Sequence, residues 1–349
     1  MSGTSADGAD LVAAEITGTP PDLKATVTSR RSAPYPDQLR QRIFAAARLP
    51  IGARELALLH ADLGRFYAAM AMGMDSAELV AVHGQTIWHE PPLTTLQIGE
   101  PAFIAAALGI PVVSDFRPAD LALGGQGAPL VAYPDFLLFG KTGRKRSIHN
   151  LGGISNLTYI PSRDSQDLMA FDTGPANCLI DEAAATMGLD CDRDGNLARA
   201  GQVNRELVQE WLAHPYLHLA PPKSTGRETW NLGSLPEARL LHGADLIATV
   251  TAFTVASITQ AYRDFVLPLG LDEIYLAGGG SANRALVAGL RSSLPVPVRL
   301  LAELGVAERD REALAFAVLG YLRYHELPNV AAPATGASQW ARAGKISLP

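Results

Sequence analysis

The sequence predicts a two-domain α/β protein, and three observations support this class. A chain of 349 residues exceeds one core of ordinary size. Short apolar runs typical of strands alternate with segments of helical periodicity. A strand–turn–strand unit around Gly3 recurs around residues 152 and 153, which indicates two similar halves facing one cleft. The composition changes near Gly140. We therefore expect domains over 1–140 and 141–349, with the last helix able to pack back on the first domain.

The first half alternates strands with helices. Leu56, Leu59, Leu63, Phe66 and Met70 are spaced three and four apart, which predicts a helix, and the break at 50–52 separates it from another. The apolar run 79–82 enters the polar turn 83–86, and 95–99 repeats that arrangement. In order, we expect strands over 11–16, 25–29, 79–82 and 111–115, and helices within 36–74 and over 101–108.

The second half contains the longest predicted helix, 244–267, which stops at Pro268. Its apolar face is broad, which indicates burial between layers. A strand over 157–160 follows the turn at 152–153. The strand 273–277 runs into the glycines 278–280 and a helix over 282–290, and this order is typical of a nucleotide contact.

Composition excludes several classes of protein. The formal net charge is −6 and no basic stripe with interleaved aromatics occurs, which argues against a nucleic-acid partner. The cysteines, Cys178 and Cys191, lack metal-site spacing and are typical of reduced intracellular thiols. No stretch has the uniform apolarity of a membrane span, and the N-terminus lacks the regions of a secretory signal. The expected compartment is the cytosol.

Three glycine-bearing turns carry the chemistry, at 1–10, 150–156 and 172–177. Glycine lets backbone N–H groups approach a phosphate closely. A carboxylate beside such a turn can bind a metal or accept a proton. Any one turn alone is more often structural, but together they suggest phosphoryl transfer from a nucleotide.

The sequence does not match three common binding-site motifs. Gly140-Lys141-Thr142 resembles the end of a P-loop, but Asp135 stands where the leading glycine is required. The loop at 125–127 begins like a dinucleotide fingerprint, but Leu130 replaces its last glycine. His83 and His89 lack zincin spacing and are more simply pocket-lining or structural residues.

The chain resembles the anhydro-N-acetylmuramic acid kinases of bacterial cell-wall recycling. The resemblance runs in order from Met1 to about Ser338, and PKSTGRE and FDTGPAN are its most specific stretches. The segments that carry it are MSGTSADGAD, VHGQTIWHE, QIGEP, DFRPADLALGGQGAPLV, NLGGISNL, FDTGPAN, DRDGN, PKSTGRE, LAGGGSAN, EALAFA and ATGAS. The resemblance implies the two-domain actin/hexokinase-like fold, with ATP in an interdomain cleft. It implies that ATP, water and 1,6-anhydro-N-acetylmuramic acid give N-acetylmuramic acid 6-phosphate and ADP.

The resemblance also implies roles for individual residues. Asp172 matches the family's base, and Asp7 is expected to reach Mg²⁺. Members usually carry an apolar strand before the MSGTS turn, so we expect the sequence beginning at Met1 to bind ATP more weakly than one that includes this strand. The implied ATP contacts are Gly3, Thr4, Ser5, Asp7, Gly8, Asp10, Gly152, Gly153, Gly278, Gly279 and Gly280. The implied sugar contacts are His83, Gln85, Arg117, Asp120, Gln126, Asn177 and Glu312, of which Arg117 is suited to the lactyl carboxylate.

The sequence leaves two other functional hypotheses open. One is another actin-like-fold kinase that acts on a different sugar or a short carboxylic acid. The other is a nucleotide-binding sensor that has lost catalysis. A small-molecule substrate is expected, without nucleic-acid or membrane partners, and a homodimer is left open.

Overall fold

The computed structural model describes residues 1–3, 6–74, 76–162 and 167–349. The chain forms two compact units. Unit 1 comprises Met1–Leu138 and Asp310–Pro349, and unit 2 comprises Phe139–Arg309. The sequence led us to expect a division at 140/141, with the last helix able to pack back on the first domain. In the structure the whole segment from Asp310 onward belongs to unit 1.

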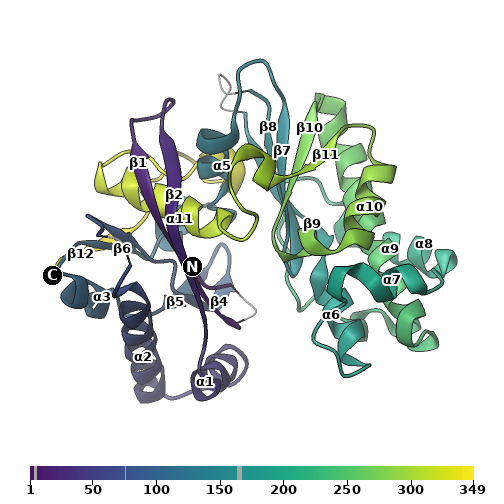
Figure 1. Ribbon diagram of the computed structural model, residues 1–349, viewed down its shortest axis with the longest axis horizontal. Coiled ribbons are helices and arrows are strands. Elements are labelled where there is room, and N and C mark those ends of the chain that lie inside the picture. The colour runs from purple at the N-terminus through teal and green to yellow at the C-terminus, as the bar shows by residue number, and fades with distance from the viewer. Residues whose placement is uncertain (4–5, 75, 163–166) are drawn as a thin grey trace. The chain divides into compact units, whose positions relative to one another are not determined.

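Unit 1 is mixed α/β, and Figure 1 labels many of its elements. It contains two packed helices, a β-hairpin, a second hairpin and a three-stranded sheet with order β12-β6-β3. Its elements are β1 (Gly8–Thr17), β2 (Lys24–Pro34), α1 (Asp37–Arg48), α2 (Ala53–Ala71), β3 (Val80–Ala81), β4 (Gln85–Glu90), β5 (Thr94–Ile98), α3 (Pro101–Leu108), β6 (Val112–Ser114), α4 (Arg117–Leu121), α5 (Ala132–Phe139, ending in unit 2), α11 (Arg311–Tyr324), α12 (Ala332–Thr335) and β12 (Lys345–Ser347).

The predicted helical region 36–74 forms α1 and α2, with the break where it was expected. Leu59 and Leu63 of α2 are fully buried, and Ile43 of α1 joins them in the larger core of unit 1. Burying an aliphatic side chain of this size contributes ~1.5–3 kcal/mol, so this face holds both helices in place. The three-and-four spacing of apolar residues therefore determined these elements.

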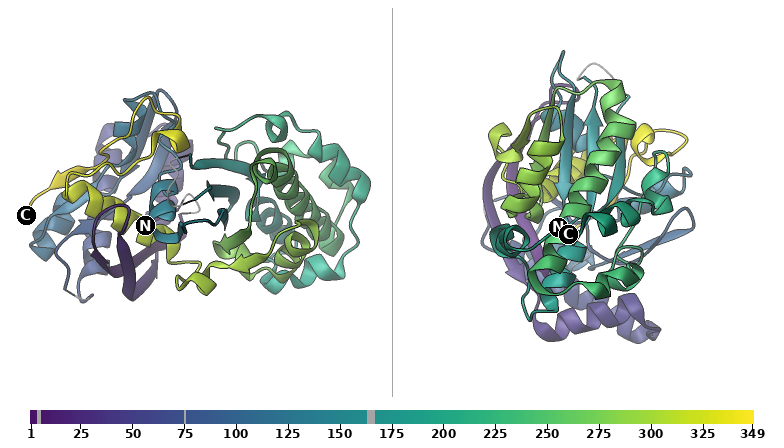
Figure 2. Two further views of the ribbon diagram at one scale, coloured as in Figure 1. Left: turned by 90° about the horizontal axis from the view of Figure 1, so that it is seen from above. Right: turned by 90° about the vertical axis from the view of Figure 1, so that its right-hand side faces the viewer.

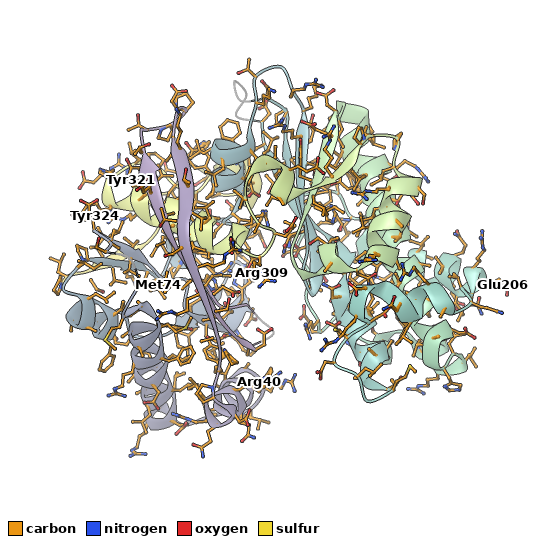
Figure 3. The ribbon with its side chains drawn as sticks, in the orientation of Figure 1. Arg40, Met74, Glu206, Arg309, Tyr321 and Tyr324 are labelled. Atoms are coloured by element: carbon orange, nitrogen blue, oxygen red, sulfur yellow. The ribbon has the colours of Figure 1, made fainter. Side chains whose placement is uncertain are left out.

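The C-terminal segment returns to unit 1 through long-range contacts. β12 pairs antiparallel with β6, and Ile346 stands opposite Val113. On α11, Leu314 and Leu319 are fully buried. The Tyr321 hydroxyl donates to Gly18 O at the tip of the β1–β2 hairpin, 2.9 Å away (Figure 3).

The segment around His83 differs from its prediction. We expected a buried strand ending in a polar turn at 83–86, and a second such unit at 95–99. Instead, Gln85 and Thr86 begin strand β4, which pairs antiparallel with β5, and Gln85 stands opposite Ile98. The turn between the two strands lies at Pro91 and Pro92, because neither proline has an N–H group for a strand ladder.

Unit 2 is built on a five-stranded sheet with helices and short 3-10 segments beside it. Its strands are β7 (Arg146–Leu151), β8 (Ile154–Ile160), β9 (Met169–Pro175), β10 (Glu273–Ala277) and β11 (Val298–Leu300). Its helices are α6 (Asn177–Ala185), α7 (Asn196–Ala200), α8 (Arg205–Leu212), α9 (Gly243–Ala261) and α10 (Arg284–Ser293). Its 3-10 segments are η1 (Arg193–Gly195), η2 (Pro215–His218), η3 (Leu232–Ser234), η4 (Pro236–Leu240), η6 (Leu267–Leu269), η7 (Gly279–Ala282) and η8 (Leu301–Leu304), and η5 (Tyr262–Val266) is a π-helical turn.

The strand order of unit 2 is β11-β10-β7-β8-β9. The β7, β8 and β9 strands form an antiparallel meander, whereas β10 and β11 run parallel to β7. The connection from β10 to β11 is α10, and α9 lies beside it on the same side of the sheet (Figures 1 and 2). This topology agrees with the α/β class predicted from sequence and with the actin/hexokinase-like fold that the resemblance implies.

The stretch around Asp172 is a strand and not the turn that the glycine suggested. Asp172 to Pro175 are the last residues of β9, in antiparallel pairing with β8. β9 is the edge strand of the sheet, and an edge strand tolerates a proline because one side of it has no ladder to complete. The turn comes only at Ala176, just before α6.

The long helix predicted over 244–267 is confirmed as α9 with the turns η5 and η6 that follow it. The run Gly243–Leu269 is long and apolar enough to cross a membrane by composition, but 67% of its most apolar window is buried inside the protein. Ile247, Val250 and Phe253 have no exposed surface. This segment is the core helix of unit 2, in agreement with the predicted burial between layers.

Candidate functional site

The predicted site residues of unit 2 lie along one edge of its sheet, the edge formed by the carboxyl-terminal ends of β7, β9 and β10. β7 and β10 are parallel neighbours, and Asn150 pairs with Ala277 near their ends. The glycine segments that follow both strands therefore leave the sheet at the same edge. β9 ends at this edge too, because Pro175 pairs with Ile154. The structure thus brings the two glycine segments and the FDTGPAN stretch together.

The turn at Gly152 and Gly153 is held from one side by the start of α6. The N–H of Asn177 donates to Gly152 O (2.9 Å) and the N–H of Cys178 to Gly153 O (3.0 Å). The Asn177 amide also donates to Leu151 O and Gly152 O. In a trans peptide the N–H points opposite to the C=O, so the amides of Gly152 and Gly153 point away from α6.

Within the described part of the chain, neither of these two amides donates a hydrogen bond. Adjacent N–H groups that converge in a turn form a concavity suited to an anion. The local geometry therefore fits the predicted phosphate turn. Asn177, which the resemblance places at the sugar, supports this turn from beneath.

Two of the three glycines after β10 have a packing reason to be glycine. A Cβ atom on Gly278 would lie 2.5 Å from Asn150 Oδ1, and one on Gly280 would lie 2.8 Å from Leu151 Cβ. Gly279, in contrast, faces open space. Close packing of this segment against the end of β7 is thus what the first and third glycines provide, and a ligand contact remains a prediction for all three.

Asp172 accepts hydrogen bonds from two groups outside its own sheet, and the pKa of its carboxyl group is raised. Its Oδ2 accepts from the N–H of Thr225 at 2.9 Å, and its backbone oxygen accepts from the Tyr216 hydroxyl at 2.8 Å. Burial raises the pKa of Asp172 to about 7; the N–H of Thr225 and the ammonium of Lys223 oppose this rise, whereas the carboxylate of Glu228 adds to it. A carboxylate with a pKa near neutrality is well suited to take a proton at physiological pH.

The loop 221–230, which contains PKSTGRE, forms the other side of this site. The family resemblance had highlighted this stretch, but no residue in it had been assigned a role. Lys223 O accepts from the Asp172 N–H at 3.1 Å. The loop therefore contacts both the backbone and the carboxylate of the predicted base. The sequence did not reveal this contact, because the loop and Asp172 are about fifty residues apart.

Lys223 anchors this loop. Its Nζ donates to Tyr216 O and Leu217 O at 3.2 and 3.1 Å, and lies 4.9 Å from the ring centre of Phe265. Burial lowers the pKa of Lys223 to about 8, against the opposing charges of Asp264 and Asp172. A cation held by two carbonyls and an aromatic face gives the loop a defined position.

In unit 1, Arg117 is the centre of the predicted sugar-binding residues. Its Nη1 donates to Gly127 O at 2.7 Å, and its Nη2 and Nε lie 2.9 and 3.2 Å from His83 Nε2. His83 Nδ1 lies 2.8 Å from Gly84 O, so Nδ1 carries the proton and Nε2 accepts. Burial and the charge of Arg117 lower the pKa of His83 well below its usual value, which keeps the imidazole neutral.

Arg117 keeps capacity for an anion. Burial lowers its pKa to about 10, opposed by Glu312 and Asp120, whose charges lie close enough to act on it. A guanidinium has five N–H donors, and the contacts above use three of them. The grouping of Arg117, His83 and Glu312 therefore fits a polar ligand that bears a carboxylate.

Asp120 and Gln126 form hydrogen bonds that hold the loop around Gly127, which Arg117 contacts. Asp120 is fully buried, and its carboxylate accepts from the Gly127 N–H (2.7 Å) and from Thr335 Oγ1 (2.6 Å). The N–H of Gln126 donates to Thr335 O. Both oxygens of Asp120 thus hold the loop, whose Gly127 carbonyl accepts from Arg117.

The N-terminal turn lies in unit 1, and Thr4 and Ser5 fall outside the described residues. Gln85 Nε2 donates to Gly3 O at 3.2 Å. Gly8 and Asp10 are in β1, where Asp10 accepts from the Ser32 hydroxyl. Asp7 is exposed just ahead of that strand. A single exposed carboxylate matches the way Mg²⁺ is usually held, by one or two carboxylates together with phosphates and water.

Among residues 1–3, 6–74, 76–162 and 167–349, no group of three or more His, Cys, Asp or Glu side chains is arranged to hold a metal ion. A Mg²⁺ that arrives with nucleotide phosphates needs no such group. A Mg²⁺ ion that binds together with a nucleotide therefore stays a prediction.

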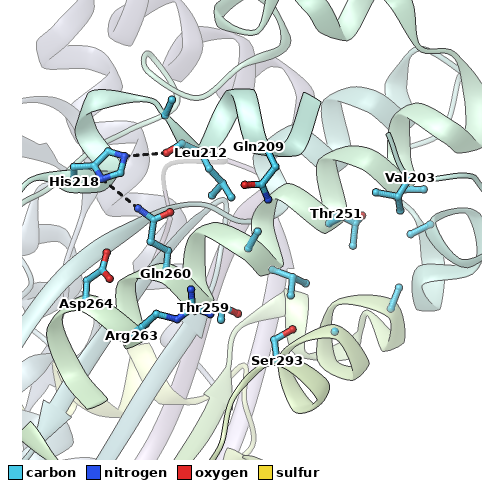
Figure 4. Close-up of a pocket in the computed structure, with 18 residues that line it drawn as sticks. Val203, Gln209, Leu212, His218, Thr251, Thr259, Gln260, Arg263, Asp264 and Ser293 are labelled. Atoms are coloured by element: carbon cyan, nitrogen blue, oxygen red, sulfur yellow. Dashed lines mark hydrogen bonds between the residues drawn. The ribbon is translucent and has the colours of Figure 1, made fainter. Parts of the chain in front are cut away.

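A separate hollow of about 1030 Å³ lies elsewhere on unit 2, over the outer face of α9 (Figure 4). Small side chains such as Ala252 and Ala256 floor it, and Gln260 at one end donates toward His218. None of the predicted site residues lines it.

Comparison with known proteins agrees with the motifs. The family model for anhydro-N-acetylmuramic acid kinase matches residues 1–348. The protein of that name from Trichormus variabilis is 41% identical over 374 residues, which cover 99% of this chain and 95% of the relative. The corresponding protein from Synechococcus elongatus is 40% identical, over 99% of this chain and 97% of its own length.

Similarity to solved structures is more distant. A ROK family glucokinase from Streptomyces griseus, solved with glucose and AMPPNP, has a TM-score of 0.37 and 15% identity over 90% of this chain and 99% of its own. That likeness is too weak to add to the sequence relationship. The full-length family match and the 40% identities are sufficient, and the chain belongs to the anhydro-N-acetylmuramic acid kinase family.

Proposed function

We propose that this protein is an ATP-dependent kinase that hydrolyses 1,6-anhydro-N-acetylmuramic acid and phosphorylates O6 of the sugar. Family membership supports the reaction class and a sugar substrate. The structural observation that carries the proposal is Asp172, a carboxyl with a pKa of about 7 at the sheet edge that also presents the unpaired amides of Gly152 and Gly153. A base and a phosphate turn at one edge are what a coupled hydrolysis and phosphoryl transfer need.

In the proposed reaction, each bond that breaks is matched by one that forms. Asp172 takes a proton from water as the water oxygen attacks C1, and the C1–O6 bond breaks. O6 forms a bond to the γ-phosphorus of ATP while the bond to the β,γ-bridging oxygen breaks and ADP leaves. N-acetylmuramic acid 6-phosphate remains with the new hydroxyl on C1.

The nucleotide is assigned to three segments. The N-terminal turn, from Gly3 to Asp10, and the Gly152–Gly153 turn are proposed to hold the phosphates, and Gly278–Gly280 the adenosine side. Asp7 is proposed to reach Mg²⁺, directly or through water, and this ion would neutralise phosphate charge. Within unit 1, we propose that Arg117 pairs with the lactyl carboxylate and that His83, Gln85 and Glu312 complete the polar contacts of the sugar.

An isotope experiment tests the coupling. When the reaction runs in ¹⁸O-water, the label should appear on the anomeric carbon of the product and not on the phosphate, because O6 comes from the bridge. The label must be read promptly, since the free anomeric hydroxyl exchanges with water. N-acetylmuramic acid, which is already hydrolysed, should be a poor acceptor. Phosphorylation of this control sugar as fast as the anhydro form would instead favour an ordinary sugar kinase.

The protonation of Asp172 predicts the pH dependence. Only the ionised carboxylate can act as a base, so kcat/KM for the sugar should fall about tenfold per pH unit below pH 7. The carboxylate of Glu228 raises the pKa of Asp172, so Glu228→Gln should move this acid limb to lower pH, by a small amount because Glu228 is exposed. The assignment of Asp172 as the base would be contradicted if the acid limb of the kcat/KM profile lay near pH 4 in the wild type and did not move in Glu228→Gln.

The wider setting is proposed on the same basis. The two compact units are taken as its domains, with the C-terminal segment part of the first. The net charge of −6 and the buried position of α9 support a cytosolic enzyme without nucleic-acid or membrane partners. A homodimer stays open.

A further inference from the structure

Arg227 occupies an unusual position beside the Gly152–Gly153 turn. A Cβ atom built on Gly153 would lie 3.0 Å from Nη2, 3.2 Å from Nε and 3.5 Å from Cζ of Arg227. The guanidinium therefore lies directly against the backbone of the turn, in space that exists because residue 153 has no side chain. Arg227 itself is exposed, so a ligand on this turn can reach it.

The charge of Arg227 is not neutralised by a direct partner. Within the described ranges of the chain, its guanidinium donates no hydrogen bond and forms no ion pair. Its charge acts on Asp181, where burial raises the pKa to about 6 and Arg227 opposes that rise. A weakly hydrated guanidinium that keeps free donors is well suited to bind an anion that reaches the turn.

The turn supplies matching donors. The amides of Gly152 and Gly153 point away from α6 and are unpaired, as described above. Two backbone N–H groups and a planar guanidinium provide several donors to one tetrahedral anion, and guanidinium–phosphate pairs are often bidentate. Sulfate or carboxylate would use the same donors, but the reaction brings a phosphate to this edge.

The loop also links this cation to the base. Thr225, two residues before Arg227, donates its N–H to the carboxylate of Asp172 at 2.9 Å. The carbonyl of Arg227 accepts from Asn231 Nδ2 at 3.1 Å, which closes the loop behind it. One short segment thus contacts the carboxylate of Asp172 and carries a guanidinium that lies beside the backbone of Gly153.

We propose that Arg227 binds the terminal phosphate of ATP and stabilises the charge that develops on it during transfer. The inference rests on the proposed function for the identity of the anion. The loop that carries Arg227 also contacts Asp172, the proposed base. The phosphate closest to the base is the one being transferred, and we therefore assign this phosphate to Arg227. This makes Arg227 a catalytic residue, whereas Thr225 and Lys223 are positioning residues.

The test compares nucleotides that differ in the terminal phosphate. Arg227→Gln should weaken binding of AMP-PNP, a non-hydrolysable analogue, by ~10–100-fold, the usual value of a charge-assisted hydrogen bond, and leave ADP binding nearly unchanged. It should lower kcat/KM for ATP by ~10²-fold or more, as loss of one transition-state donor does. Arg227→Lys should recover part of the loss, because an ammonium keeps the charge but not the planar fork.

A second variant and a control separate this role from simple packing. Gly153→Ala places a methyl group 3.0 Å from Arg227 Nη2, closer than ordinary contact, so it should displace the guanidinium and also weaken AMP-PNP more than ADP. Arg205→Gln removes an exposed arginine at the start of α8 and should change neither affinity. Equal loss of ADP and AMP-PNP in Arg227→Gln, or wild-type kcat/KM, overturns the proposal.

The two proposals fail in different ways. If the wild type does not phosphorylate the anhydrosugar, yet Arg227→Gln still loses AMP-PNP selectively, the sugar assignment is wrong and the role of Arg227 stands. If the anhydrosugar is phosphorylated at the same rate by wild type and Arg227→Gln, the function stands and the role of Arg227 is rejected.

Discussion

Asp172→Asn should lower kcat by ~10²–10⁴-fold, the usual effect of removing a positioned general base. An amide has the size of the carboxylate and can still accept from the Thr225 N–H, but it cannot take a proton from water. Binding of AMP-PNP, measured by calorimetry, should be nearly unchanged, because Asp172 is proposed to contact water and not the nucleotide. The rate is measured by ADP release in the presence of the anhydrosugar.

The stability of this variant provides an independent check. The pKa of Asp172 is raised in the folded protein, so folding favours its protonated form. That contribution is present in acid and is lost as the pH rises through about 7. Asp172→Asn should therefore unfold at a higher temperature than the wild type at pH 8, and the advantage should vanish near pH 4.

Asp190→Asn is the matched control for both measurements, since Asp190 is an exposed carboxylate of the same unit. It should leave rate and stability unchanged. Turnover by Asp172→Asn within a few fold of wild type would show that another group is the base.

Arg311→Met should destabilise unit 1 by ~3–5 kcal/mol, because breaking a buried ion pair leaves one charge without compensation. Arg311, the first residue of α11, is 1% exposed, and Asp135 in α5 is fully buried. The guanidinium donates to both carboxylate oxygens, with Nε 3.0 Å from Oδ1 and Nη2 on Oδ2. Arg311 Nη1 has no hydrogen-bond partner within the described residues.

Hydrogen exchange in peptides from α5 and α11 is the suitable measurement, because a chain of two units need not unfold in one step. Both peptides should exchange faster in Arg311→Met. The double variant Asp135→Leu with Arg311→Met should be close to wild type, since apolar residues of similar volume often replace a buried pair without loss. A single variant as protected as wild type would show that the pair contributes no stability.

Long periodic segments were predictable because their information is local. The spacing of Leu59 and Leu63 determined α2, and the broad apolar face of 244–267 determined α9. Both helices bury a face that any partner layer can cover, so no knowledge of the partner was needed. The hairpin β4–β5 was not predicted, because the pairing of Gln85 with Ile98 depends on which segments meet.

The site divides in the same way. Motif spacing pointed to Asp172 and to the turns at Gly152 and Gly278, because glycine next to a strand and a carboxylate nearby is a local pattern. It did not point to Thr225 or Arg227, which reach Asp172 and Gly153 across long sequence separations. Asn177 and Asp120 hold backbone turns through their hydrogen bonds, and their contact with a sugar stays a prediction.

By itself, the sequence determined the α/β class, the long helices and the family, because each depends on composition, periodicity or short motifs. Only the tertiary structure decided that the segment from Asp310 onward completes unit 1, that Asp172 lies within an edge strand, and that the loop 221–230 closes over it. Those features depend on contacts between distant segments, whose free energy comes from burial and hydrogen bonding that no local pattern records.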